Sequence, residues 1–299
     1  MKDVHYQAES KVRANGIEIA YDSFGEPGAP PLVLIMGFTA QMILWDEGFC
    51  EGLARRGYRV IRFDNRDVGH TSWFTEAGTP RIGVLVAALM RGEAVHVPYK
   101  LIDMAEDTLG LMDVLGIESA HVVGMSMGGM IAQTMAVHFP ERLRTLTSLS
   151  STTGHPGLPQ ATPEAWEMLT KPAPMDREGF VEHAVPVWRV INGPLVTIDE
   201  EFIRERARRT FERGISLEGY ARQMAAITAS GSRRKALRSV RVPALVIHGD
   251  SDPLLPPAHG IDTAEAIPGA KLHIVKGMGH DIPSVFWAEL IEAIAGHAR

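Results

Sequence analysis

The sequence has little cysteine and no long hydrophobic run. Cys50 is the single cysteine among 299 residues, which excludes an intrachain disulfide framework and the usual cysteine-based zinc sites. We expect its side chain to be a small buried hydrophobe. The longest apolar run, residues 82–90, is about half the length that a membrane-spanning helix needs. The N-terminal residues lack the apolar segment of a signal peptide, so we expect a cytoplasmic protein with no membrane span.

The chain also lacks an excess of positive charge. Its 30 Lys and Arg side chains stand against 36 Asp and Glu side chains, a net charge of −6, and no basic field for nucleic acid is expected. Apolar residues make up 45% of the chain, enough for the core of a large globular unit. The His-Glu-x-x-His pattern and paired cysteines are missing, as are the glycine-rich patterns of nucleotide sites. No metal and no cofactor are therefore expected.

Short apolar runs alternate with helical patterns over much of the chain. Residues 11–25 predict a hairpin with Asn15-Gly16 at its turn. Apolar runs that end in Gly or a polar residue predict strands, several of them covered on both faces. The expected strands are residues 30–37, 58–64, 120–125, 143–150, 243–250 and 270–277, and the expected helices are residues 47–57, 101–116, 127–140, 258–267 and one from residue 283. This alternation implies an α/β fold with a parallel sheet.

Two segments interrupt the alternation. Residues 151–235 are polar and helical, with Pro and Gly punctuation, which predicts a helical cap over a core domain formed by residues 1–150 and 236–299. Within the cap, the mixed charges of residues 199–214 predict a solvated helix face. Residues 72–99 form a smaller, irregular insertion in the core, and its apolar run is a candidate for lining a pocket.

A serine framed by glycines stands between a predicted strand and a predicted helix. The residues from Gly124 to Gly128 fit the Gly-x-Ser-x-Gly pattern, which on its own is short enough to arise by chance. Its position is more informative, because a sharp strand-to-helix turn exposes the serine hydroxyl. Glycines on either side remove Cβ atoms that would clash there, and the helix N-terminus directs backbone N–H groups at negative charge. We therefore predict that Ser126 is a nucleophile.

A serine nucleophile needs a base, and the base needs a carboxylate that orients it. In this architecture they follow the serine in the order acid, then histidine, in loops after later strands. The loop at residues 248–257 offers Asp250 and Asp252, and the spacing leaves the choice between them open. Of the 12 histidines, only His280 stands in a Gly-rich loop directly after the last strand. His280 is the predicted base.

Acyl transfer also needs two N–H donors for the oxyanion of the intermediate. The backbone of Met127, directly after the nucleophile, is the first predicted donor, and that of Phe38, in the loop after an early strand, is the second. Met36, Trp45 and Met125 are candidates for the substrate pocket. If they line it, an apolar acyl or alcohol group is favoured over a charged one. The alternative is that each of them packs in the core.

Five segments together resemble the α/β-hydrolase superfamily over nearly the full chain, namely MGFT, FDNRDVGHTS, VVGMSMGG, IHGDSDP and GMGH. Within it, the chain is similar to bacterial capped esterases, including the aclacinomycin methylesterase-like group. The resemblance implies a mostly parallel eight-stranded sheet flanked by helices, with residues 151–235 as the helical cap. It points to Asp252, the aspartate before a proline, as the acid. It also implies Phe38 and Met127 as oxyanion donors and residues 64–67 as a structural loop.

Met36-Gly37 departs from the His-Gly of many relatives, so no substrate is carried over from them. The predicted function is a serine carboxylic ester hydrolase that forms an acyl-enzyme on small to medium, apolar esters. The same triad suits cofactor-free perhydrolysis of the haloperoxidase type, lactone opening and C–C bond hydrolysis. A non-catalytic ligand receptor on this fold is disfavoured by the complete triad. A small-molecule ester is the predicted partner, and the oligomeric state, homodimer included, stays open.

Overall fold

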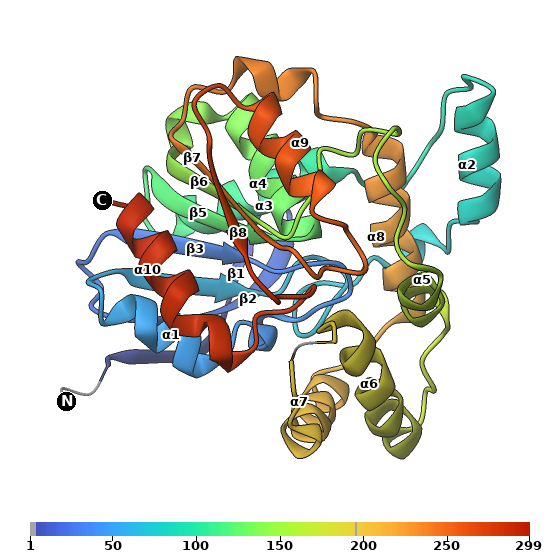
Figure 1. Cartoon of the computed structure of the whole chain (residues 1–299), viewed down its shortest axis with the longest axis horizontal. Helices are drawn as coiled ribbons and strands as arrows, with labels where there is room; N and C mark the ends of the chain where they lie inside the picture. The colour runs from blue at the N-terminus through green and yellow to red at the C-terminus, as the bar shows by residue number, and fades with distance from the viewer. Residues whose placement is uncertain (1–3, 195) are drawn as a thin grey trace.

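An eight-stranded sheet forms the centre of the computed structural model, which describes residues 4–194 and 196–299 (Figure 1). Its strands are β1 (Tyr6–Ala14), β2 (Ile17–Phe24), β3 (Pro31–Ile35), β4 (Arg59–Phe63), β5 (Ala120–Met125), β6 (Leu143–Leu149), β7 (Ala244–Gly249) and β8 (Lys271–Val275). The spatial order is β1-β2-β4-β3-β5-β6-β7-β8. β2 is antiparallel to both β1 and β4, and the other neighbours pair in parallel. The prediction of a mostly parallel α/β sheet is confirmed.

Helices cover both faces of this sheet. The flanking helices are α1 (Glu47–Ala54), α3 (Leu101–Val114), α4 (Met127–His138), α9 (Ala258–Ala266) and α10 (Trp287–His297). α3 and α4 pack on one face and α1 and α10 on the other. In β3, Val33 and Ile35 point to the first cluster and Leu32 and Leu34 to the second. A strand covered on both sides needs such an unbroken apolar run.

The hairpin at the N-terminus has the turn that its sequence predicts. Asn15 and Gly16 both have positive φ, 47° and 77°, which are angles that Asn and Gly adopt more readily than other residues. Cys50 in α1 is fully buried, and burial raises the pKa of its thiol. It therefore packs as the small hydrophobe expected. None of the helices in the described ranges combines the length and apolar content that crossing a bilayer requires.

Four further helices lie between β6 and β7 and form the helical insertion. They are α5 (Pro163–Thr170), α6 (Arg177–Ile191), α7 (Glu200–Glu212) and α8 (Leu217–Ser230). In Figure 1 these helices lie along the right and lower right of the sheet. The prediction of a helical insertion is confirmed, whereas its bounds as a separate cap at residues 151–235 stay a prediction.

The segment at residues 72–99 is not irregular throughout. Its apolar run forms helix α2 (Ile82–Met90), which contacts α8 and lies at the edge of the molecule (Figure 1). Only Leu85 of this helix is buried, while Val84 and Met90 are 59% and 84% exposed. The apolar side chains of the run therefore face mostly outward, and a role in lining a pocket stays a prediction. The sequence showed their polarity but not which way they would face.

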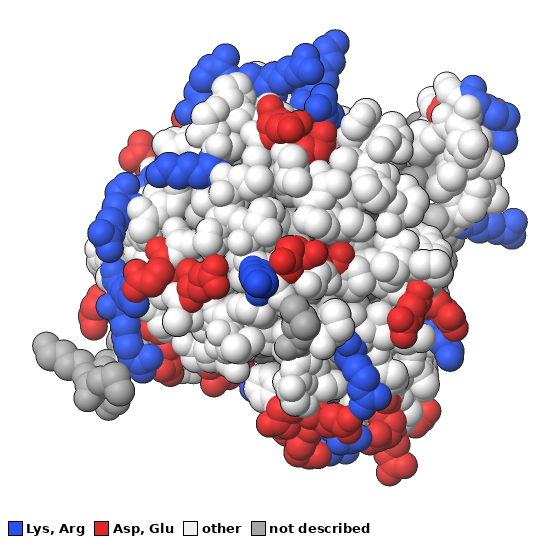
Figure 2. Space-filling view, in the orientation of Figure 1, with Lys and Arg blue, Asp and Glu red and all other residues white. Residues whose placement is uncertain are grey.

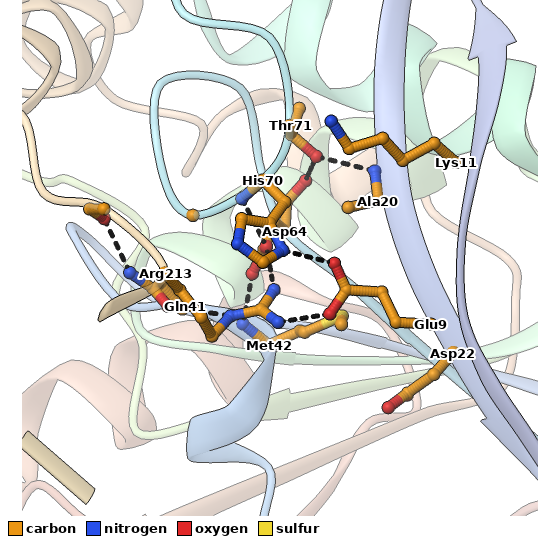
Figure 3. A network of polar contacts seen from close by, with 12 residues as sticks. Glu9, Lys11, Ala20, Asp22, Gln41, Met42, Asp64, His70, Thr71 and Arg213 are labelled. Carbon is orange, nitrogen blue, oxygen red and sulfur yellow. Dashed lines mark hydrogen bonds and ion pairs between the residues drawn. The ribbon is translucent and has the colours of Figure 1, made fainter. Parts of the chain in front are cut away.

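The charged run at residues 199–214 is only partly solvated, contrary to the prediction. Figure 2 shows acidic and basic side chains mixed over α6 and α7, as an exposed charged surface requires. Arg213, however, points inward with its side chain 12% exposed, and it pairs with Glu9 of β1 and with Asp64 (Figure 3). Both carboxylates come from the core, so these two ion pairs of Arg213 attach the insertion to the sheet. Helical periodicity gave no sign of partners so distant in the sequence.

Glu9 allows a test of this attachment. Burial raises the pKa of Glu9, but hydrogen bonds from Arg213 and His70 outweigh it, and the net shift is downward. A depressed carboxyl pKa stabilises the fold above the unfolded pKa, about 4.3 for Glu, and this contribution is lost as pH falls through the folded value. We expect Glu9→Gln to lower the urea midpoint of unfolding at pH 7, with a difference from wild type that shrinks below about pH 4. The exposed pair of Glu18 with Lys11 is the control, and an equal loss in Glu18→Gln would contradict a special role for Glu9.

Candidate active site

The turn from β5 into α4 places Ser126 in a strained conformation. Ser126 has φ 54° and ψ −119°, a region that residues other than glycine rarely adopt. Its backbone is nevertheless paired, because its N–H donates to the Leu149 carbonyl at 2.9 Å. Its own carbonyl accepts from Met130 N–H at 3.1 Å and from the Ser151 hydroxyl at 2.7 Å. These hydrogen bonds hold the strained turn in place.

Two glycines make this turn sterically possible. A Cβ atom on Gly124 would lie 2.1 Å from the carbonyl oxygen of Gly128. A Cβ atom on Gly128 would lie 2.0 Å from the carbonyl oxygen of Ile35, the last residue of β3. Both distances are far below van der Waals contact with backbone that cannot move aside. The packing of β3, β5 and α4 thus accounts for the glycines that frame Ser126.

The structure brings Ser126, His280 and Asp252 together. His280 Nε2 lies 3.0 Å from Ser126 Oγ, and His280 Nδ1 lies 2.7 Å from Asp252 Oδ2. The three residues follow β5, β7 and β8, whose carboxyl ends lie at the same edge of the parallel sheet. Asp252 and His280 are buried, and Ser126 is partly exposed. An imidazole between a hydroxyl and a carboxylate can take up the hydroxyl proton and return it to a leaving group.

The structure distinguishes the two aspartates that the spacing left open. Asp252 Oδ1 accepts hydrogen bonds from the Leu254 and Leu255 N–H groups at 2.9 and 2.8 Å, which fixes the carboxylate while Oδ2 contacts the imidazole. Asp250 is exposed, and its Oδ1 accepts from Gly277 N–H at 2.7 Å. Asp250 therefore caps a turn, and Asp252 is the aspartate that contacts His280.

A second histidine, His248, lies next to Asp252. Its Nε2 is 2.7 Å from the Leu255 carbonyl oxygen and 3.5 Å from Asp252 Oδ2. Burial lowers the pKa of His248 despite the nearby carboxylate, which favours the neutral imidazole with its N–H donated to Leu255. A neutral His248 leaves the charge of Asp252 to interact with His280. The sequence gave no signal for this role, since His248 only closes a predicted strand.

The loop after β3 lies directly beside the serine. A Cβ atom on Gly37 would lie 3.2 Å from Ser126 Cβ. The backbone of the loop that leads into Phe38 is therefore close to the serine hydroxyl. Among the residues that the structure describes, neither the Phe38 N–H nor the Met127 N–H has an acceptor. Two free donors next to a nucleophile can bind the oxyanion of a tetrahedral intermediate.

The three pocket candidates are all buried. Met36 and Met125 flank the Gly37–Ser126 contact and are 3% and 6% exposed. Trp45 is fully buried in the cluster that packs on α1 and α10, where its ring stacks on Phe49 with centroids 5.7 Å apart. Trp45 is therefore a core residue in this structure and has no surface to offer a ligand. For this tryptophan, the alternative given by the sequence, packing in the core, describes the structure better than the pocket prediction.

The insertion fixes the loop that carries His280. The His280 N–H donates to the Ile191 carbonyl at the end of α6, at 2.6 Å. A Cβ atom on Gly279 would lie 2.3 Å from the same carbonyl oxygen, so only glycine permits this approach. Asp281 turns away from the imidazole toward Asn192 and Arg206, at 3.3 and 3.7 Å. Sequence reasoning missed these contacts because each joins segments far apart in the chain.

Proteins of known sequence or structure share this fold over nearly the whole chain. Residues 30–285 match the family model described as alpha/beta hydrolase fold. A rhodomycin D methylesterase from Streptomyces sp. (strain C5) is 32% identical, with 93% of this chain and 94% of the relative aligned. A 2-hydroxy-6-oxononadienedioate/2-hydroxy-6-oxononatrienedioate hydrolase from Paraburkholderia phymatum is 31% identical over 88% and 85% of the two chains. The structure of an enol-lactonase from Burkholderia xenovorans LB400 has a TM-score of 0.71 and 25% identity, and covers 96% of this chain and 99% of its own.

The two neighbouring aspartates provide a matched pair of variants. Asp252→Asn preserves size but removes the carboxylate that contacts His280, and we expect kcat to fall about 10⁴-fold, as when a triad loses its orienting acid. Asp250→Asn retains an oxygen that can accept from Gly277 N–H, and we expect kcat close to wild type. Steady-state rates on p-nitrophenyl acetate measure both variants, with circular dichroism as the check on folding. Similar losses in the two would rule out a distinct role for Asp252.

Proposed function

This chain belongs to the α/β-hydrolase family and is a hydrolase, and on that premise we propose that it cleaves carboxylic esters through Ser126, His280 and Asp252. The observation that carries the proposal is the position of the His280 ring, whose two nitrogens contact the serine and the aspartate. Asp252 and His280 are buried, while Ser126 is partly exposed and can therefore be reached from outside.

In the first half of the reaction, Ser126 Oγ attacks the ester carbonyl and His280 Nε2 takes the hydroxyl proton. Asp252 stabilises the imidazolium through its contact with Nδ1. The carbonyl oxygen becomes an oxyanion, which the N–H groups of Phe38 and Met127 bind. The intermediate collapses when the C–O bond to the alcohol breaks, and His280 returns the proton to the departing alkoxide. An acyl group then remains on Ser126.

In the second half, water takes the place of the alcohol. His280 removes a proton from water as the oxygen attacks the acyl carbon, and the same two N–H groups bind the second oxyanion. The bond to Ser126 Oγ breaks and the serine recovers its proton from His280. The products are one carboxylic acid and one alcohol, with no redox change and no consumed side chain.

A methyl ester of an apolar acid is the substrate class that we propose. The rhodomycin D methylesterase is named for methyl ester cleavage and is similar to this chain over 93% of its length. The partly buried ring of Phe38 beside the nucleophile favours an uncharged acyl group, whereas Met36 and Met125 belong to the same buried core cluster as Trp45. The names of the other relatives point to C–C bond and enol-lactone hydrolysis, so those reactions are the competing outcomes of the test.

We also propose that residues 151–235 act as a cap over a core formed by residues 1–150 and 236–299. Support comes from contacts of the insertion with the loop of His280, through Ile191, and with the loop of Phe38, through α8. Residues 72–99 are proposed as a smaller insertion that supports α8 through α2.

Labelling and a substrate series test the function together. We expect a fluorophosphonate to label the wild-type protein at one site and to leave Ser126→Ala unlabelled, with heat-denatured wild type as the control. Among methyl, ethyl and butyl esters of one aromatic acid, we expect the methyl ester to have the highest kcat/KM. Absence of labelling in the wild type would indicate a receptor without catalysis. Cleavage of a C–C substrate or a lactone in preference to all esters would reject ester hydrolysis.

A further inference from the structure

A buried glutamine of the insertion contacts the loop that carries the Phe38 N–H. Gln223 lies in α8 and its side chain is fully buried. Its Oε1 accepts a hydrogen bond from Thr39 N–H at 2.9 Å, and its Nε2 donates to the Arg66 carbonyl at 2.8 Å. Because a backbone N–H only donates and a carbonyl only accepts, these two partners fix the orientation of the amide.

The loop segment between Met36 and Thr39 is held at both ends by side chains. The Met36 carbonyl accepts from Asn65 Nδ2 at 2.9 Å, while the Thr39 N–H donates to Gln223. Thr39 has φ 61°, a strained angle that persists only where surrounding contacts enforce it. Gly37 and Phe38 lie between the two anchors, so the direction of the Phe38 N–H depends on both of them.

The position of Gln223 is itself fixed by the core. The neighbouring Arg222 forms a two-fold hydrogen-bonded pair with Asp67, at 2.9 and 2.7 Å, and both side chains are fully buried. A Cβ atom on Gly219 would lie 2.7 Å from the Asp67 carbonyl oxygen, so α8 packs directly against residues 64–67. The glutamine therefore reaches the loop of Phe38 from a rigidly docked helix.

We propose that Gln223 is a positioning residue for the oxyanion hole. It holds Thr39 so that the Phe38 N–H is directed at the oxyanion that forms on the substrate, and its amide makes turnover depend on the docking of α8. This inference rests on the proposed ester hydrolysis, and it adds a residue from the insertion to the groups on which that reaction depends. An oxyanion donor acts more strongly on the transition state than on the bound ester, so its misplacement lowers kcat more than it changes KM.

Gln223→Met tests the proposal, because methionine has a similar length but offers Thr39 no comparable acceptor. We expect kcat per active site to fall about 10- to 100-fold with KM nearly unchanged, somewhat less than the loss of an entire oxyanion donor. Fluorophosphonate titration counts the active sites, so a partly unfolded preparation does not affect the result. A trifluoromethyl ketone, which adds to a serine as a tetrahedral oxyanion, should bind more weakly by the same factor. Gln223→Leu, of different shape, should show the same loss.

Gln133→Met is the matched control. Gln133 is also fully buried, but in α4, and its side-chain hydrogen bonds within the described residues go to Ser148 and Arg233, at 3.1 Å each, and not to the loop of Phe38. We expect this variant to lose stability while kcat per active site and inhibitor affinity stay near wild type. Equal kcat and inhibitor values for Gln223→Met and Gln133→Met would overturn the positioning role. A wild type that neither labels nor hydrolyses esters would instead reject the proposed function.

Discussion

The close approach of α4 to the end of β3 is the constraint on which the whole site depends. Because Gly128 lies against the Ile35 carbonyl, the chain must turn sharply after β5, and Ser126 takes its strained φ at that turn. The same approach places Gly37, two residues after Ile35, in contact with Ser126. One packing contact therefore sets both the exposure of the hydroxyl and the proximity of the loop that carries Phe38. A side chain at Gly128 would separate these two parts of the site.

The meeting of Ser126, Asp252 and His280 was largely predictable from the sequence because all three lie at strand ends. The loops after β5, β7 and β8 each carry one of the residue types that the predicted chemistry needs, and parallel strands place those loops at one edge. The choice of Asp252 over Asp250 was not local: spacing alone left it open, the family resemblance pointed to Asp252, and the contacts of the two carboxylates distinguish them. Trp45 is a prediction that failed, because this aromatic residue, a few positions after the loop of Phe38, packs into the core.

The contacts of the helical insertion could not be predicted from the sequence. The Thr39 and Gln223 partners are 184 residues apart, and a glutamine on an amphipathic helix has no feature that marks it as buried. Arg213 in a run of mixed charges is equally inconspicuous, although it pairs with two core carboxylates. Through Ile191 and Gln223 the insertion touches the loop of His280 and the loop of Phe38. The insertion thus holds two loops of the candidate site through direct hydrogen bonds.

Mass spectrometry of the protein quenched in acid during turnover of p-nitrophenyl acetate tests acyl transfer through Ser126 most directly. The mechanism predicts a fraction of the chains heavier by one acetyl group, located by peptide mapping to the segment that contains Ser126. The adduct should disappear once the substrate is consumed, because His280 activates water to release it. Turnover with no modified protein, or an acetyl group on a different residue, would contradict a covalent intermediate on Ser126.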